Sequence, residues 1–563
     1  MKKLLTLFCS VALATTAWAD GTITMPNGLR IYVDDTFKTG YILSSDVSGD
    51  LVIPATVTDG GKEYKITTID ANAFRYKTAL TSVKIEGSNM LYIYDEAFNG
   101  CSSLTSVTLP SSLEELGTRA FMACTKLQSI SIPRSIKKLG ENVFAGCTSL
   151  ASASLPEGIT ELPKALFYKC SALSQVNVPS TVKTIGASVF YQCAALPSLT
   201  LPTGVTKIGN NAFNGCTSLA SINIPNGVST IEDYTFTNSG IANITLPNSV
   251  TTVGRDVFKG CVNLAEITLS SSMTEIPENL CYGDKVLAKV VIPGGITSIG
   301  RQAFYNCAAL PSIEIPNSVT TMDVQVFQGC AALETIKLST ALTTIPENTF
   351  NGCKALKSVE IPASVTALAK QAFYNCSALA TIKLNEGLTS LGENALRGTA
   401  LTEVNFPEGV TTIGKAVLYG DKVLTKVTLP STVTTLETNA FYNCTTLAEV
   451  HNRMAAPLTI VANTFYKAQT GTLYVPKGTL AAYQAADVWK SFKNIVEEES
   501  EDPGTPGDVN GDDTVDITDA NILINIILGK DDAGNYGGRA DVDGDGTVDV
   551  SDANAVINTI LGK

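Results

Sequence analysis

Apolar and polar positions repeat along most of this chain with steps of 22, 23 or 24 residues. The unit reads A-F-x-x-C-x-x-L-x-x-I-x-I-P-x-x-V-x-x-I-G, and an apolar anchor fills its second position 18 times. A constant period in this range is typical of a solenoid, whose units fold only by stacking on their neighbours. The anchors are Phe74, Phe98, Phe121, Phe144, Phe167, Phe190, Phe213, Phe236, Phe258, Cys281, Phe304, Phe327, Phe350, Phe373, Leu396, Leu418, Phe441 and Phe465.

Each unit contains one clear strand signal. In "LTSVTLP", Val107 and Leu109 alternate with Ser106 and Thr108, which predicts a short strand with the apolar pair inward. Pro110 ends the strand, and the following V-x-x-I-G supplies a second apolar pair before the turn into the next anchor. We expect a repeat solenoid of short parallel β-strands with a rise of ~4.8 Å per coil.

The repeat resembles the BspA-like type of bacterial leucine-rich repeat, found in surface and secreted proteins. The opening "GLRIYVDD…LVIPATVTDGGKEYKITTIDANAF" is similar to the N-terminal cap of that family, and "GTLYVPKGTLAAYQAADVWKSFKNIVEE" is similar to its C-terminal cap. We therefore expect a cap and first coil over 20–73, repeats over 74–470 and a closing cap over 471–496. The resemblance implies adhesion or protein binding without identifying the partner, and we expect a host or bacterial surface protein or a glycan.

Twelve cysteines share one register of the repeat, and Cys281 takes an anchor position instead. Buried free thiols that pack as small apolar groups are the interpretation we favour. Disulfides between adjacent coils stay open, because the expected rise falls within the ~4.4–6.8 Å Cα separation of a disulfide. A metal or catalytic role is disfavoured, since the sequence contains no C-x-x-C pair. The twelve are Cys101, Cys124, Cys147, Cys170, Cys193, Cys216, Cys261, Cys307, Cys330, Cys353, Cys376 and Cys444.

Two surfaces of the repeats are candidates for partner binding. The outward strand positions from Thr108 to Thr268 are small neutral polar residues, including Thr200, Asn223 and Thr245, and they are either a contact surface or an ordinary solvated sheet face. Further on, Glu314, Lys337, Glu360 and Lys383 alternate in sign, so this row can neutralise itself. Tyrosines that follow the anchor, Tyr305 and Tyr374 among them, serve either partner contacts or packing at the coil corner.

The N-terminus predicts export. Lys2 and Lys3 precede an apolar run that ends at Ala17-Trp18-Ala19, as in a cleaved signal peptide over 1–19, so we expect a secreted or cell-surface protein. We expect no membrane span, because no later segment approaches the ~20 apolar residues that a spanning helix needs. The net charge of −13 lies mostly after residue 500, where 14 Asp or Glu accompany three Lys or Arg. This charge distribution predicts no basic surface that would bind nucleic acid.

The acidic C-terminal region contains one pattern twice. Residues 497–507 are rich in Pro and Gly and predict a flexible linker. The segments "DVNGDDTVDITD" and "DVDGDGTVDVSD" follow it and lie 33 residues apart. Each has the ligand spacing of a 12-residue calcium loop, which predicts two calcium ions. Asp513 stands where the second loop has Gly546, so the first site is expected to be weaker or distorted. The predicted ligands are Asp508, Asn510, Asp512, Thr514, Asp516 and Asp519, then Asp541, Asp543, Asp545, Thr547, Asp549 and Asp552, the threonines through their carbonyls.

A helix with an apolar stripe is predicted after each loop. The stripes are Ala520, Leu523, Ile524, Ile527 and Leu528, then Ala553, Val556, Ile557, Ile560 and Leu561. Duplicated loop–helix units over 508–563 resemble a type I dockerin. The resemblance implies docking to a cohesin-type domain of a scaffold protein, through Ile517 and Thr518 in one half and Val550 and Ser551 in the other.

We expect a binding protein and not an enzyme. The mature chain has one histidine, His451, which we interpret as an exposed edge residue, and no G-x-S-x-G or H-E-x-x-H motif occurs. The favoured function is a non-catalytic binding or adhesion protein with a repeat arm and a calcium-dependent docking module. The alternative is a glycan-binding accessory subunit of a polysaccharide-degrading assembly.

Overall fold

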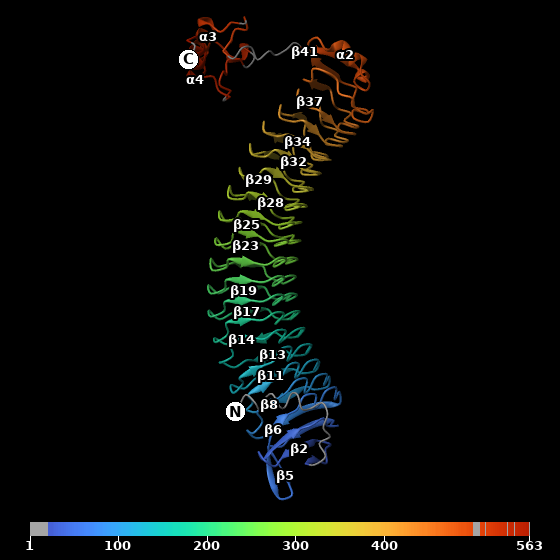
Figure 1. Ribbon diagram of the computed structural model, residues 1–563, viewed down its shortest axis with the longest axis vertical. Coiled ribbons are helices and arrows are strands. Elements are labelled where there is room, and N and C mark those ends of the chain that lie inside the picture. Colours follow the sequence, from blue (N-terminus) through green and yellow to red (C-terminus); the bar gives the residue numbers. More distant parts are fainter. Residues whose placement is uncertain (1–20, 499–506, 513, 537–538, 545, 562–563) are drawn as a thin grey trace.

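The computed structural model describes residues 21–498, 507–512, 514–536, 539–544 and 546–561. The predicted leader at 1–19 and residues 499–506 of the predicted linker lie outside the described residues. Figure 1 shows the repeats as coils stacked in single file along the longest axis, with β2 and β5 at one end and α2 and β41 at the other. The predicted solenoid fold is confirmed.

The predicted strand forms the first of two rows that follow the solenoid. The row is divided into short sheets of two or more strands, within which neighbouring strands pair in parallel. In one of them Ile244, Ile267 and Val290 of three coils lie side by side beneath the sheet. The strands of this row are β7 (Leu80–Ile85), β9 (Ser106–Thr108), β11 (Ser129–Ser131), β13 (Ser152–Ser154), β15 (Gln175–Val176), β17 (Ser198–Thr200), β19 (Ser221–Asn223), β21 (Asn243–Thr245), β23 (Glu266–Thr268), β25 (Lys289–Val291), β27 (Ser312–Glu314), β29 (Thr335–Lys337), β31 (Ser358–Glu360), β33 (Thr381–Lys383), β35 (Glu403–Asn405), β37 (Lys426–Leu429) and β39 (Glu449–Asn452).

The V-x-x-I-G segment forms a second row of two-residue parallel strands. Its second residue is apolar and mostly buried, whereas its first residue faces outward. The strands are β8 (Tyr92–Ile93), β10 (Glu115–Leu116), β12 (Lys138–Leu139), β14 (Glu161–Leu162), β16 (Thr184–Ile185), β18 (Lys207–Ile208), β20 (Thr230–Ile231), β22 (Thr252–Val253), β24 (Glu275–Ile276), β26 (Ser298–Ile299), β28 (Thr321–Met322), β30 (Thr344–Ile345), β32 (Ala367–Leu368), β34 (Ser390–Leu391), β36 (Thr412–Ile413) and β38 (Thr435–Leu436).

All 18 anchors are fully buried, as predicted. The phenylalanine rings stack between coils with nearly parallel planes, at 5.0 Å between the ring centroids of Phe98 and Phe121 and 5.6 Å between those of Phe304 and Phe327. Cys281 interrupts this stack once, and the leucine anchors Leu396 and Leu418 interrupt it again. The stacked rings form the axial core that holds neighbouring coils together.

The cysteine register has a structural explanation that goes beyond apolar packing. All thirteen cysteines in the described residues are buried free thiols, so the structure contains none of the disulfides left open above. Each of the twelve in register donates its S–H to the carbonyl of the preceding coil's anchor, as Cys330 Sγ does to Phe304 O at 3.2 Å and Cys444 Sγ to Leu418 O at 3.1 Å. The thiol therefore adds a hydrogen bond between coils.

Caps close both ends of the stack. The N-terminal cap contains β1 (Thr22–Thr24), β2 (Arg30–Asp34), β3 (Thr39–Ile42), β4 (Gly49–Ile53), β5 (Thr56–Asp59) and β6 (Lys62–Ile69), with antiparallel pairs β1–β2, β2–β3 and β5–β6. The C-terminal cap contains β40 (Thr472–Pro476), α2 (Leu480–Ala485), the short 3₁₀ helix η2 (Trp489–Ser491) and β41 (Asn494–Glu498). Trp489 is buried against Phe465, the last anchor, so the cap covers the open end of the ring stack.

The C-terminal region forms a small module with its own core. It contains α3 (Ile517–Ile527), the short 3₁₀ helix η3 (Ala533–Tyr536) and α4 (Val550–Ile560). Its buried apolar residues are Val509, Ala520, Leu523, Ala540, Ala553 and Val556. We call the described part of residues 507–561 the tail module, and the stacked coils and their caps the repeat arm.

Candidate functional site

The first loop of the tail module is organised around the carboxylate of Asp519. Its Oδ1 accepts hydrogen bonds from the backbone N–H groups of Val509 and Asn510, at 2.8 and 2.9 Å, and its Oδ2 accepts from Asp516 N at 2.9 Å. Asp516 in turn caps α3 by accepting from Thr518 N at 2.7 Å. One buried carboxylate thus ties the start of the loop to the start of the helix.

The second loop repeats this arrangement. Asp552 Oδ1 accepts from Val542 N at 2.6 Å and Asp543 N at 3.1 Å, and its Oδ2 accepts from Asp549 N at 2.8 Å. Asp549 caps α4 through Ser551 N at 2.7 Å, and hydrogen bonds from Ser551 lower the pKa of the Asp549 carboxyl. The sequence duplication is therefore also a duplication of geometry.

Three predicted ligands of the second loop converge on one point. A carboxylate oxygen from each of Asp541, Asp543 and Asp552 lies within 4.8 Å of the other two. Three carboxylates this close repel one another unless a cation lies between them, and a hard divalent cation such as Ca²⁺ prefers such oxygen ligands. The donor set fits calcium. Asp545, a fourth predicted ligand, lies outside the described residues.

The first loop has acidic residues at most of the positions that carry them in the second loop. Among the described residues, however, its carboxylates do not form a cluster of three. Asp508 is buried and accepts from Gly511 N at 2.8 Å, while Asp512 accepts from Thr514 N at 3.0 Å and from Asn510 Nδ2 at 2.9 Å. The Thr514 hydroxyl also donates to Asp512, and this hydrogen bond, followed by those from Asn510 and Thr514 N, lowers the pKa of the Asp512 carboxyl. Asp513, on which the predicted weakness of this site depends, lies outside the described residues.

The helices bury only part of the predicted apolar stripes. Ala520, Leu523, Ala553 and Val556 form the core between α3 and α4 as expected. The far ends of the stripes are exposed, because a two-helix module has no third layer to cover the last turns. The stripe positions that are exposed are Ile524, Ile527, Leu528, Ile560 and Leu561.

The four residues predicted for docking are all on the surface. Ile517 and Val550 begin the two helices and are 64% and 60% exposed, and Thr518 and Ser551 beside them are exposed as well. Together with the uncovered ends of the stripes, these residues give a very small module a large exposed apolar area. Exposed apolar surface of this kind marks an interaction site more often than it marks an ordinary surface.

On the repeat arm, the outward strand positions also lie on the surface. Thr200 and Asn223 pair directly across β17 and β19, and Thr245 lies in the next strand of the row. The predicted self-neutralisation is confirmed farther along the row, where Lys337 Nζ lies 2.7 Å from Glu314 and Lys383 Nζ lies 3.0 Å from Glu360. Both ion pairs join neighbouring coils.

The tyrosines after the anchors form outer stacks. Tyr305 stacks on Tyr282, with ring centroids 4.7 Å apart. Arg397 lies over the ring of Tyr374 at 5.8 Å and over that of Tyr419 at 4.4 Å. Arg397 follows the anchor Leu396 and so occupies the tyrosine register. An arginine in a tyrosine register is the signal that predicts such a cation–π contact.

The interpretation of His451 as an exposed edge residue is wrong. Its side chain is only 17% exposed, with Nδ1 2.6 Å from Glu498 and Nε2 3.2 Å from Glu449. Its ring also stacks on Tyr474 at 4.5 Å between centroids. The histidine joins the last repeat to β40 and β41 of the cap, and these contacts cross up to 47 residues of sequence, which a local pattern does not reveal.

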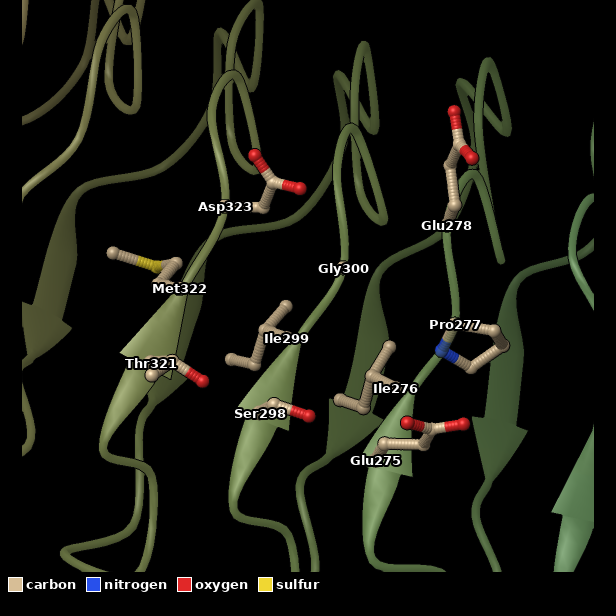
Figure 2. Close-up of a pocket in the computed structure, with 10 residues that line it drawn as sticks. All are labelled: Glu275, Ile276, Pro277, Glu278, Ser298, Ile299, Gly300, Thr321, Met322 and Asp323. Carbon is tan, nitrogen blue, oxygen red and sulfur yellow. The ribbon is translucent and has the colours of Figure 1, made fainter.

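A hollow of about 480 Å³ lies along β24, β26 and β28 (Figure 2). Glu275, Ser298 and Thr321 occupy equivalent positions in three successive coils, and Glu278 and Asp323 lie on the turns after the strands. The hollow is therefore part of the regular surface of the second row. It combines carboxylates with hydroxyl groups, and it brings together none of the predicted partner-binding residues.

Comparison with protein families identifies both parts of the chain. The model of the BspA type leucine rich repeat region matches in overlapping stretches at residues 67–197, 183–310, 275–397 and 343–472. The chain belongs to this family. The model of the dockerin type I domain matches residues 506–561, so the tail module is a dockerin domain.

Similar solved structures come from several bacteria. A leucine-rich repeat protein from Bacteroides ovatus is 23% identical, covers 78% of this chain and 98% of its own, and has a TM-score of 0.44. A leucine rich cell surface protein from Faecalibacterium prausnitzii is 24% identical, with coverages of 77% and 95% and a TM-score of 0.35. The leucine-rich repeat protein of T. pallidum is 26% identical, with coverages of 43% and 90% and a TM-score of 0.29. No curated protein matches the chain.

Both families are non-catalytic binding modules, and type I dockerins generally bind calcium. BspA-type repeat proteins and dockerin proteins are typically extracellular or bound to the cell surface. Within the described residues, no helix has the length and apolar character needed to cross a membrane.

Proposed function

We propose that this protein is an exported, non-catalytic binding or adhesion protein that attaches to a scaffold through its dockerin. The leader at 1–19 directs export. The repeats over 74–470, with their caps at 20–73 and 471–496, recognise a partner. The dockerin at 508–563 follows the linker at 497–507 and docks to the scaffold. The observation that carries the proposal is the duplicated loop–helix unit, in which ordered acidic loops are joined to helices with exposed apolar residues.

Calcium is the ion that these loops are proposed to hold, one in each loop. The side chains of Asp508, Asn510, Asp512, Asp516 and Asp519 serve the first ion, and those of Asp541, Asp543, Asp545, Asp549 and Asp552 serve the second. Thr514 and Thr547 contribute carbonyls. Asp519 and Asp552 support this assignment, because each already fixes the path of its loop through three backbone N–H groups.

The docking surface is proposed to include Ile517, Thr518, Val550 and Ser551, and its partner is a cohesin-type domain of a scaffold protein. The two halves present the same residue types at the same place on duplicated helices, so each half offers an equivalent surface. An apolar residue at the centre of such a surface contributes most to affinity, and the hydroxyl beside it contributes mainly to orientation.

The repeat arm is proposed to recognise a host or bacterial surface protein along β17, β19 and β21, where Thr200, Asn223 and Thr245 face outward. This stretch supports the assignment because its side chains are short and neutral, so an extended partner can approach the sheet closely. The next stretch of the row carries ion pairs between coils, which a partner would have to desolvate.

The experiment that tests this proposal is the binding of the full chain to a panel of recombinant type I cohesin domains, in calcium and in a chelator. We expect binding in calcium only, and we expect Ile517→Asp combined with Val550→Asp to weaken it at least tenfold. Val291→Asp is the matched control, because Val291 is a 65% exposed valine on the repeat arm. Failure of every cohesin to bind in calcium, or equal binding in chelator, would contradict the proposal.

A further inference from the structure

A second hollow, of about 600 Å³, lies along the turns that follow successive anchors, from Phe144 to Phe236. Its volume falls within the ~300–1,000 Å³ typical of small-molecule sites. Ala194 and Gly215 are the smallest residues that line it, and Lys169, Gln192 and Asn238 are exposed around it. We call this hollow the Tyr191 groove, after the aromatic residue that lines it.

The ring of Tyr191 lines the groove and is half-buried. Tyr168 of the preceding coil covers one of its faces, with ring centroids 4.8 Å apart and planes 9° apart. The following coil places Asn214 in the same register, and the Asn214 Nδ2 donates to Asn211 Oδ1 at 2.7 Å within its own turn. The short amide side chain is therefore held in its own coil, whereas Tyr282 is followed by a stacked Tyr305.

The other groups in the groove are neutral hydrogen-bonding groups with a single cation. Ser171, Asn214 and Thr217 supply hydroxyl and amide oxygens, and the Lys169 ammonium lies 5.2 Å from the Tyr168 ring. No carboxylate is among the residues that line the groove. A flat aromatic face beside many uncharged donors and acceptors matches a sugar, which has an apolar C–H face and a rim of hydroxyl groups.

A peptide is a poorer match for the same surface. The backbone groups at the groove are already paired between coils, Gln192 N with Asn214 O at 2.7 Å and Gly215 N with Thr237 O at 2.9 Å. An extended peptide would find no free strand edge there. The groove also lacks an apolar pocket for a peptide side chain, since Tyr191 and Ala194 are the apolar residues that line it.

We propose that the Tyr191 groove is a binding site for an oligosaccharide, with one pyranose ring on the face of Tyr191 opposite Tyr168. Amide and hydroxyl groups of Gln192, Asn214 and Asn238 orient the sugar, and Lys169 accommodates an acidic substituent. This site lies on the repeat arm and is independent of the dockerin, so the failure of one proposal leaves the other standing.

The test is binding of the full chain, in calcium, to an array of defined plant cell-wall and mucin-type oligosaccharides, followed by calorimetry with the strongest binder. We expect Tyr191→Ala to weaken binding at least tenfold. Tyr94→Ala is the matched control, because Tyr94 also stacks on a tyrosine, Tyr92, and lies outside the groove, and we expect it to change affinity less than twofold.

A second variant separates loss of the site from loss of folding. Ala194→Lys should fill the groove and abolish binding without unfolding the coil, because Lys285, Lys354 and Lys422 occupy the equivalent position in other coils. Its melting temperature should stay within a few degrees of that of the parent. Absence of binding to every oligosaccharide, or full binding by both Tyr191→Ala and Ala194→Lys, would overturn the proposal.

Discussion

Asp284 is a buried exception to the cysteine register of the repeats. It replaces the register cysteine in the coil whose anchor is Cys281, it is fully buried, and its Oδ1 accepts from Cys261 N at 2.8 Å. Burial raises the pKa of this carboxyl to about 8. The folded protein therefore keeps the proton over a pH range in which the unfolded chain has lost it.

Asp284 makes the stability of the arm depend on pH. Between about pH 4 and pH 8 the folded state binds one more proton than the unfolded state. The contribution of Asp284 to the free energy of unfolding is therefore greatest below pH 4. It falls as pH rises, by up to about 1.4 kcal/mol per pH unit. Asp284→Asn keeps the acceptor for Cys261 N and removes the titration. We expect the variant to exceed the parent in denaturant stability at pH 8 and to match it near pH 4. Parallel curves across this range would contradict the assignment.

The register cysteines lead to a prediction about reactivity. Burial raises the pKa of the Cys216, Cys330 and Cys376 thiols to about 12, so almost none of their thiolate is present at pH 8. We expect no reaction of the native protein with a thiol reagent at pH 8. In denaturant without reductant, the thirteen cysteines after the leader should all react. A lower count in denaturant would indicate disulfides.

At the scale of elements, outer stacks lie beside both interruptions of the inner ring stack. Where Cys281 replaces phenylalanine, Lys259, Tyr282 and Tyr305 stack in the neighbouring register. Where Leu396 and Leu418 replace it, the outer stack is Tyr374, Arg397, Tyr419, Tyr442 and Tyr466. The outer stack supplies contacts between coils where the inner stack lacks them.

This arrangement predicts that Arg397 stabilises the coils around it. Arg397→Ala removes two cation–π contacts of ~0.5–1 kcal/mol each, so the free energy of unfolding should fall by about 1–2 kcal/mol. Hydrogen exchange should rise mainly in the coils from Tyr374 to Tyr466. Arg301→Ala is the control, since Arg301 is exposed outside the stack. Equal effects of the two substitutions would show that the stack contributes nothing specific.

The elements that follow a strict period were predictable from the sequence. Phe74 to Phe465 define the coils, alternation around Val107 defines the strand row, and the spacing from Asp508 to Asp552 defines two duplicated loops. The thiol bonds to anchor carbonyls and the partial burial of His451 were not predictable, because they join residues from different coils or from the cap. The exposure of the ends of α3 and α4 was not predictable either, because an apolar stripe in the sequence does not show whether another layer of the structure covers it.

At the scale of the whole molecule, the two modules depend on different interactions. The repeat arm is held by ring stacks, thiol bonds and paired backbone, none of which involves a metal. The dockerin has a core of few residues and clustered carboxylates that repel one another until a cation binds. A domain of this size depends on such a cation for stability. Calcium should therefore govern docking while leaving recognition by the arm unchanged.

The most direct test of this division is hydrogen exchange of the full chain with calcium and with a chelator. The account predicts that amides of residues 507–561 lose protection on chelation and recover it when calcium is restored, while amides of the repeats at 67–472 keep the same protection throughout. Unchanged protection of the dockerin in the chelator, or loss of protection along the repeats, would contradict it.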